Sequence, residues 1–294
     1  MYLRLATILT ISLLLLTSCG GGGSSGSGTP PPPGGGGGGG GPTDPVISVA
    51  EAHRFLRQAS FGPTPTEVEK VRDIGFEAWI DQQLLEPVSL QLPYMDDLPE
   101  PENSREGQTN RLDAWFQNVL NGKDQLRQRV AFALSEIIVI SDQGNLFNFP
   151  NGLADYYDKL AINAFANYPD LLKTVTLTPA MGRYLSMLGN QKPDKAKNIR
   201  PDENYAREVM QLFSIGLVML NKDGSVVLDQ DNQPIPTYDQ AVIEAFAHVF
   251  TGWTFYGSEA FNRPSYIFRA PMVAFQAYHD EGEKRLLNDV ILPA

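Results

Sequence analysis

The stretch DENYAREVMQLFSIGL, residues 202–217, says more about the fold than any other part of the sequence. At 100° per residue its polar and apolar side chains fall on opposite faces, which predicts an amphipathic α-helix. Gly216 follows the periodic part and is expected to cap the helix at its C-terminus. The polar face carries Glu203, Asn204, Arg207, Glu208 and Gln211, and the apolar face carries Ala206, Val209, Met210 and Phe213.

Two interpretations of this polar face are open. In the first it is solvated, and Glu203 forms an i,i+4 ion pair with Arg207 that contributes about 0.3 kcal/mol. In the second it faces a cleft, where Glu208 is an acid, a base or a ligand and Arg207 orients it. Asn204 and Gln211 are then candidate binding residues. Periodicity alone favours the solvated interpretation.

The segment after this helix has a different character. Two turn clusters, at 222–225 and 229–232, flank the apolar residues 226–228. Apolar residues between turn signals are typical of short strands, so residues 217–238 are predicted to form a small β-hairpin.

A further helix is predicted over 241–250, because Thr237 and Gln240 form a capping box ahead of it. His248 on this helix has apolar neighbours. A lone histidine in such surroundings is more often a packed, hydrogen-bonded core group than a ligand. Trp253 is expected to anchor the core.

The stretch YHDEGEK, residues 278–284, is a dense polar cluster. His279, Asp280 and Lys284 could bind a cation or an anionic group, or transfer protons. The alternative is a charged surface turn, and the sequence leaves the two interpretations nearly balanced.

The sequence upstream of residue 202 is mainly helical in pattern. Ser48 and Glu51 form a capping box, and Thr64 with Pro65 starts a second helix that Gly75 ends. Proline and polar residues predict loops over 87–101 and 189–201. Further helices are predicted over 76–85, 111–120, 124–140, 153–166, 171–177 and 179–188, so the fold class is mainly α, a multi-helix domain with a small β-hairpin insertion.

Composition argues against several functions. The formal net charge of −11 is a poor match to nucleic acid, which requires clustered lysine and arginine. The sequence contains no H-E-x-x-H motif, no P-loop and a single cysteine, so it predicts no metal site. Without a second cysteine no disulfide forms within the chain, and stability must come from the core.

The single cysteine stands at the end of an apolar N-terminal segment. Residues 1–18 have a basic start, a short apolar run and small residues, which is typical of a secretory signal. Residues 16–19, LTSC, resemble a bacterial lipobox, so Cys19 is predicted to carry lipid and to anchor the protein in the cell envelope, at the outer membrane or cell surface. An ordinary signal peptide is the alternative. Residues 19–45 are a Gly/Ser/Pro-rich linker that is expected to be disordered, and the folded domain is predicted over 46–294.

Four motifs occur in a fixed order: RFLRQASFGPTP at 54–65, ENYARE at 203–208, TGW at 251–253 and HDEGEK at 279–284. Together they resemble the bacterial family of domain of unknown function 1800 (DUF1800). The resemblance implies an exported, mostly helical protein, with a sulfatase-like protein of domain of unknown function 1501 (DUF1501) as a possible companion. It implies no particular reaction.

The chain departs from the family pattern at three places. Many relatives have arginine where His248 stands, and a histidine-bearing motif of the relatives is replaced here by residues 134–137, LSEI. Relatives also usually continue beyond the His-Asp motif, so we expect this chain to be truncated at its C-terminus.

Two functions from different classes follow. The first is a lipid-anchored envelope protein that binds a partner or polymer as an assembly or export factor. The second is a hydrolase-like envelope enzyme that uses one polar cleft. Its candidate catalytic residues are Arg207, Glu208, His279, Asp280 and Lys284.

Overall fold

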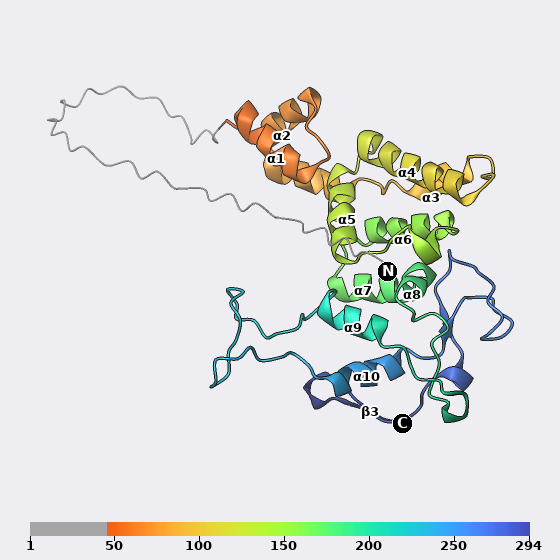
Figure 1. Cartoon of the computed structure of the whole chain (residues 1–294). Coiled ribbons are helices and arrows are strands. Elements are labelled where there is room, and N and C mark those ends of the chain that lie inside the picture. Colours follow the sequence, from red (N-terminus) through yellow and green to blue (C-terminus); the bar gives the residue numbers. More distant parts are fainter. Residues whose placement is uncertain (1–45) are drawn as a thin grey trace, which may run out of the picture. The chain divides into compact units, whose positions relative to one another are not determined.

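The structure is a computed structural model that describes residues 46–294, so the predicted signal segment 1–18, Cys19 and the linker 19–45 lie outside the described residues. The described part is mainly α-helical, as predicted, with two small antiparallel sheets of two strands each (Figure 1). The elements are α1 (Val49–Ala59), α2 (Pro65–Leu85), α3 (Gln91–Asp96), α4 (Ser104–Asn121), α5 (Gln125–Ile137), α6 (Pro150–Ile162), α7 (Tyr168–Thr176), α8 (Pro179–Tyr184), α9 (Asn204–Gln211), α10 (Gln240–Val249), β1 (Trp253–Thr254), β2 (Val273–Ala274), β3 (Lys284–Arg285) and β4 (Ile291–Leu292).

Local capping signals set the starts of the first helices. The Ser48 hydroxyl accepts from the backbone N–H of Glu51, and the Glu51 carboxylate accepts from the N–H of Ser48, which completes the predicted capping box. Thr64 caps α2 with Pro65 in its first turn. Gly75, at φ +86°, kinks α2 at the boundary where the sequence predicts one helix to end and the next to begin.

Several helix boundaries differ from the prediction. The predicted loop 87–101 contains the short helix α3, and α4 begins at Ser104, well before residue 111, because the Asn103 side chain caps it. Helix α9 ends at Gln211, short of Gly216. The N–H of Gly216, which has φ +74°, donates to the carbonyl of Met210 and so closes a turn after the helix.

Helix α6 is the centre of the main core. It packs against α3, α4, α5, α7 and α8, and Leu153, Tyr156 and Leu160 on it are fully buried. Its buried residues also include Asp155 and Asp158, so the helix is enclosed on most sides although it is not apolar throughout. A smaller cluster, which includes Leu56 and Trp79, joins α1 to α2.

The segment 217–238, cyan in Figure 1, leaves α9 and returns to α10. Its two predicted turns are present. Met219 N–H donates to the Ile235 carbonyl, Val227 N–H to Met219 and Ile235 N–H to Val227, at 2.9–3.1 Å. The segment 217–238 is therefore held by isolated β-bridges between three short stretches of backbone, and it does not form one regular hairpin.

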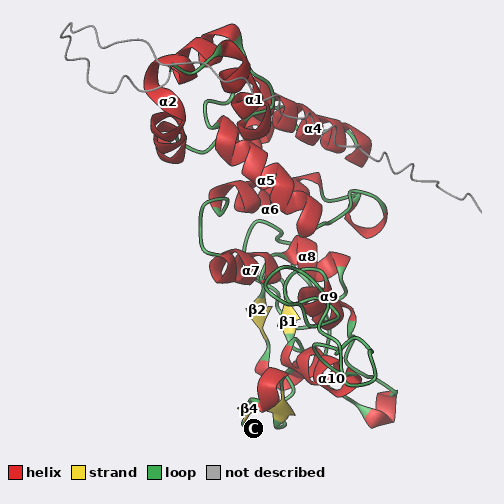
Figure 2. Ribbon diagram, turned by 90° about the vertical axis from the view of Figure 1, so that its left-hand side faces the viewer, coloured by secondary structure: helices red, strands yellow, loops and turns green. Residues whose placement is uncertain are grey.

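The strand pair β1–β2 brings the TGW and HDEGEK motifs together (Figure 2). Trp253 pairs with Ala274 and Thr254 with Val273. The Gly252 carbonyl also accepts from the N–H of Phe275 at 2.7 Å. Trp253 is half-buried against the main core, so its predicted anchoring position is confirmed.

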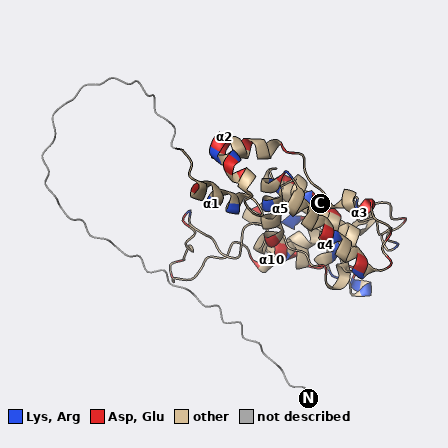
Figure 3. Ribbon diagram, turned by 90° about the horizontal axis from the view of Figure 1, so that it is seen from above, with Lys and Arg blue, Asp and Glu red and all other residues tan. Residues whose placement is uncertain are grey.

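Acidic and basic side chains are interspersed on several helices (Figure 3). On α2, Arg72 forms an ion pair with Glu69 at 2.7 Å. Among residues 46–294, no helix combines the length and the apolar character that a bilayer crossing requires.

Candidate functional site

The polar face of α9 is held by an ion pair that water reaches. Arg207 Nη2 lies 2.9 Å from Glu203 Oε2, and these side chains are 40% and 34% exposed. Gln240, at the start of α10, donates to the same Glu203 oxygen at 2.9 Å. Pairs of this spacing on a helix surface contribute about 0.3–0.5 kcal/mol. This geometry favours the solvated interpretation for Arg207.

Glu208 is half-buried, and its Oε2 atom is buried without a hydrogen-bond partner among the described residues. Tyr238 lies close to it. Burial raises the pKa of Tyr238, the Arg207 guanidinium opposes the rise, and the Glu208 carboxylate adds to it. The two predicted binding residues lie on the same helix, Asn204 exposed and Gln211 half-buried.

The polar turn 278–284 packs against the end of α10. His248 Nδ1 lies 2.6 Å from Asp280 Oδ2. The Thr251 hydroxyl accepts from the backbone N–H of Asp280 at 2.9 Å and donates to the His248 carbonyl at 2.7 Å. His279 Nδ1 lies 2.9 Å from the Thr251 carbonyl. We call His248, Thr251, His279, Asp280 and Lys284 the turn cluster.

The core placement predicted for His248 is wrong. Its side chain is 32% exposed and is paired with Asp280. The reason is tertiary: α10 packs beside β3, so the ring at the end of this helix meets the carboxylate of the turn rather than apolar core.

Charges within the turn cluster stabilise the ionised form of Asp280. Burial by itself would raise the pKa of Asp280. The N–H of Gly282, the hydrogen bond from His248 and the charges of His248 and Lys284 outweigh burial, so the pKa lies below its ordinary value. The Lys284 ammonium donates to the carbonyls of Asp280 and Gly282 at 2.6 Å each and lies 3.8 Å from Asp280 Oδ1. With its side chain only 7% exposed, Lys284 holds the turn from inside the fold.

Gly252 allows the two motifs to pack this closely. Its φ is +86°, and a Cβ at this position would lie 2.9 Å from the backbone nitrogen of His279. A larger residue would therefore be strained and would also push His279 away. The turn cluster depends on a glycine that lies outside it.

The α9 polar face and the turn cluster are separate in the hydrogen-bond network. Glu203, Arg207 and Gln240 bond to one another, and none of the hydrogen bonds or ion pairs within residues 46–294 joins them to the turn cluster. Across the same residues, no three His, Cys, Asp or Glu side chains gather as a metal ion would require. Within residues 46–294, the two halves of the single cleft that a hydrolase-like function needs are therefore not joined by a direct hydrogen bond or ion pair.

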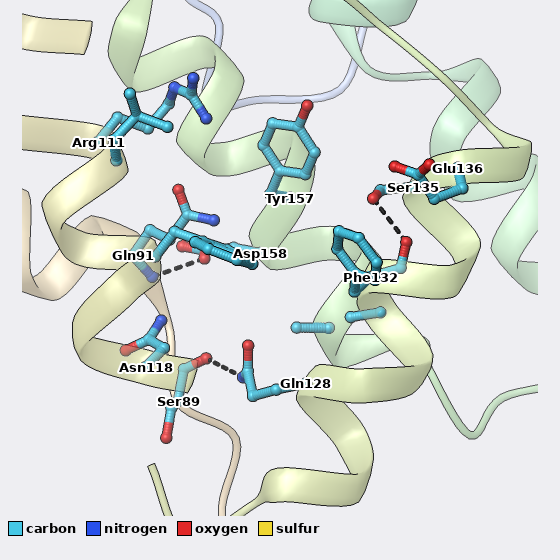
Figure 4. A pocket seen from close by; sticks show the side chains of 14 residues that line it. Ser89, Gln91, Arg111, Asn118, Gln128, Phe132, Ser135, Glu136, Tyr157 and Asp158 are labelled. Carbon is cyan, nitrogen blue, oxygen red and sulfur yellow. Dashed lines mark hydrogen bonds between the residues drawn. The ribbon is translucent and has the colours of Figure 1, made fainter. Parts of the chain in front are cut away.

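A cavity of about 270 Å³ lies between α4, α5 and α6 (Figure 4). Neither the α9 polar face nor the turn cluster contributes to its lining. Arg111, Trp115 and Asn118 on α4 share one helix face at spacings i, i+4 and i+7. Gln128 and Phe132 on α5 face them. The cavity therefore has both amide and aromatic walls.

Helix α6 and the start of α3 close the cavity on another side. Asp158, which is 4% exposed, accepts from the backbone N–H of Gln91 at 2.7 Å and from that of Leu92 at 3.0 Å. Burial raises the pKa of Asp158 to about 6, although these two hydrogen bonds act against the rise. At neutral pH the carboxyl group is therefore mainly ionised, and it becomes protonated as the pH falls through about 6.

Three carboxamides of the cavity have hydrogen-bonding capacity that the fold does not use. Gln91 is 4% exposed, and its Oε1 is buried without a partner within residues 46–294. Gln128 Nε2 donates to the Ser89 carbonyl and to Asp124, which directs Oε1 toward the cavity (Figure 4). Asn118 contributes a half-buried amide. The lining carboxamides that the protein leaves unpaired and that face the cavity, those of Gln128 and Asn118, could bond to a ligand there.

The Arg111 guanidinium is already engaged by the protein. Its Nε donates to Gln108 at 2.9 Å and its Nη2 to Asp142 at 3.1 Å, and its centre lies 5.5 Å from the Tyr157 ring. The positive charge is therefore balanced within the protein.

The aromatic wall is fixed by ring packing. The Trp115 and Phe132 centroids lie 6.2 Å apart, and Phe61 packs edge-on against both at 5.8 and 5.9 Å. Aromatic contacts of this kind restrict ring rotation. The wall is thus formed before any ligand arrives.

Sequence reasoning missed this cavity, although a signal was present. The spacing of Arg111, Trp115 and Asn118 places one cation, one aromatic ring and one amide on a single helix face. Such a mixed face is also typical of the border between core and surface, so only the packing of α5 and α6 against it reveals the cavity.

These features define a mainly helical domain with a preformed polar and aromatic cavity. Residues 54–294 match the family model described as a protein of unknown function (DUF1800), so the chain belongs to this family. No curated protein and no solved structure matches the chain.

Proposed function

We propose that this DUF1800 member is an exported, lipid-anchored cell-envelope protein that works by binding, as an assembly or export factor for an envelope partner or polymer. One observation carries the binding role. The charged groups of the turn cluster bond to one another, whereas the cavity between α4, α5 and α6 is lined by three carboxamides, of which Gln128 turns its Oε1 toward the cavity. A cavity with free donors and acceptors is what a binding site offers.

The envelope location is supported by the sequence. Residues 16–19 resemble a lipobox at the end of a short apolar segment. The net charge of −11 disfavours electrostatic adhesion to anionic lipid, which leaves the lipid on Cys19 as the membrane contact. A sulfatase-like DUF1501 protein is a candidate partner, since the family resemblance implies one.

The test compares the tagged full-length chain with Cys19→Ser in a bacterial host fed labelled palmitate. We expect label in the membrane fraction for the wild type, loss of label for Cys19→Ser, and an envelope protein or polymer that co-purifies with the wild type. An unlabelled wild-type chain that still carries residues 1–18 contradicts the lipid anchor. A labelled chain that retains nothing after cross-linking contradicts the binding role.

The hydrolase-like alternative has one observation in its favour. The 2.6 Å contact between His248 and Asp280 orients the imidazole, and oriented His–Asp pairs serve as general bases. Hydrolysis of nitrophenyl esters or glycosides by the wild type, lost in Asp280→Asn at unchanged stability, would support the enzyme.

A further inference from the structure

The cavity between α4, α5 and α6 has the chemistry of a site for a neutral sugar ring. We infer that it binds one pyranose unit of a neutral saccharide, an inference that rests on the proposed binding role. At about 270 Å³ it lies just below the usual range for small-molecule pockets, so it suits a ligand with a single ring.

The polar walls match hydroxyl groups better than they match charges. A carboxamide presents both donors and an acceptor, and a hydroxyl group can pair with either. Gln91, Asn118 and Gln128 supply three carboxamides. Gln128 donates through Nε2 to the Ser89 carbonyl and to Asp124, so its Oε1 is turned toward the cavity and can accept from a sugar hydroxyl.

The charges in the cavity disfavour anionic ligands. Arg111 is held by Gln108 and Asp142, so it offers little net attraction to phosphate or carboxylate. Asp158 already accepts two backbone N–H groups, and Glu136 also lines the cavity. Bringing an anionic ligand here would require its desolvation without a free positive counter-ion, whereas a neutral ligand avoids that cost.

The aromatic wall suits the apolar face of a sugar ring. Trp115 on α4 and Phe132 on α5 both line the cavity with ring centroids 6.2 Å apart, and Phe61 holds both in place. A pyranose ring has C–H groups on one face and hydroxyls around its edge. Apolar contact with the wall and hydrogen bonds to the amides can therefore form together.

The experiment titrates the purified full-length protein with maltotriose, cellotriose and diacetylchitobiose by calorimetry, and follows fluorescence for the contribution of Trp115. A trialanine peptide and glucose 6-phosphate serve as amide and anionic probes. We expect at least one neutral saccharide to bind more tightly than either of them.

Two variants place the site, and one matched variant controls for them. Asn118→Ala removes one amide and is expected to weaken binding about fivefold to tenfold. Gln91→Leu removes a second carboxamide from the cavity lining and is expected to weaken saccharide binding, while thermal stability is unchanged or higher because the buried Oε1 has no partner to lose within residues 46–294. Gln117→Ala, on the same helix but hydrogen-bonded outside the cavity to Asn121, should bind like the wild type.

Three results would overturn the inference: no saccharide binds, trialanine or the phosphate binds better, or both cavity variants bind like Gln117→Ala. A destabilised Gln91→Leu with normal binding would show that the amide is structural and would count against it as well. Failure of the palmitate and cross-linking test would leave these titrations unaffected, so the two proposals fail separately.

Discussion

Replacing Lys284 by methionine tests whether the turn cluster is a structural lock. The change keeps the length of the side chain but removes the ammonium, which is buried and donates to the carbonyls of Asp280 and Gly282 at 2.6 Å each. It also removes the positive charge 3.8 Å from the Asp280 carboxylate.

The expected magnitude follows from these contacts. Hydrogen bonds to charged groups contribute about 1.5–3 kcal/mol each, so the two bonds account for roughly 3–6 kcal/mol. Gly282 is exposed, so water can replace the ammonium at its carbonyl. The wild type also loses several kcal/mol on folding because its ammonium is taken out of water, and the methionine variant avoids this cost. We therefore expect a net loss of about 2–3 kcal/mol.

The assays are urea unfolding, which gives the free energy of unfolding, and thermal unfolding, which gives Tm, both on the full-length protein and both followed by circular dichroism. For a domain of this size, about 2–3 kcal/mol corresponds to a fall in Tm of roughly 4–12 °C. The control is Lys197→Met, whose ammonium pairs with Asp194 at 2.8 Å but is 72% exposed. A Lys284→Met variant as stable as this control would refute the structural role and would strengthen the case for a catalytic Lys284.

Three further predictions concern packing, pH and surface charge. Gly252→Ala should lower the free energy of unfolding by about 2–4 kcal/mol, because alanine is strained at positive φ and its Cβ overlaps His279. The control Gly224→Ala, at φ +83° in open space, should lose only the contribution of the backbone strain. Urea midpoints of both variants check this, and equal losses would contradict it. Asp158 holds its proton more tightly in the folded state, with a pKa of about 6. Its contribution to stability is therefore complete below pH of about 4 and falls by roughly 3 kcal/mol as pH rises through about 6. The difference in stability between the wild type and Asp158→Asn should decline over this window, and a difference that rises with pH would contradict the raised pKa. Arg207→Ala should change the free energy of unfolding by about 0.5 kcal/mol or less, because its ion pair is exposed; a loss comparable to that of Gly252→Ala would show that the pair is not a solvated one.

Local signals explain why much of the helical fold follows from the sequence. The capping box of Ser48 and Glu51, and the pair Thr64–Pro65, act over a few residues and need no partner from elsewhere. The mainly α fold class and the family are likewise confirmed. The predicted boundaries were wrong at two kinds of place. The start of α4 was missed because Asn103 was not recognised as its cap. The end of α9 was placed too late because the helix stops at Gln211, and a turn that reaches Gly216 follows it.

The candidate site could be predicted only in part. The turn 278–284 is a dense cluster in the structure as well, but its partner His248 was assigned to the core. The hydrogen bond from the N–H of Gln91 to Asp158 joins residues 67 positions apart, and no pattern within either segment announces it. Such a pair is visible only once α3 and α6 are packed together.

The sequence alone determined most of the segments that become helices and which of their faces are polar, because periodicity and capping are properties of neighbouring residues. The tertiary structure alone decided which polar groups satisfy one another, as in the turn cluster, and which are left free, as at Gln91. The physical reason is range: a hydrogen bond forms or fails over a few tenths of an ångström, and that distance is set by the packing of helices distant in the chain.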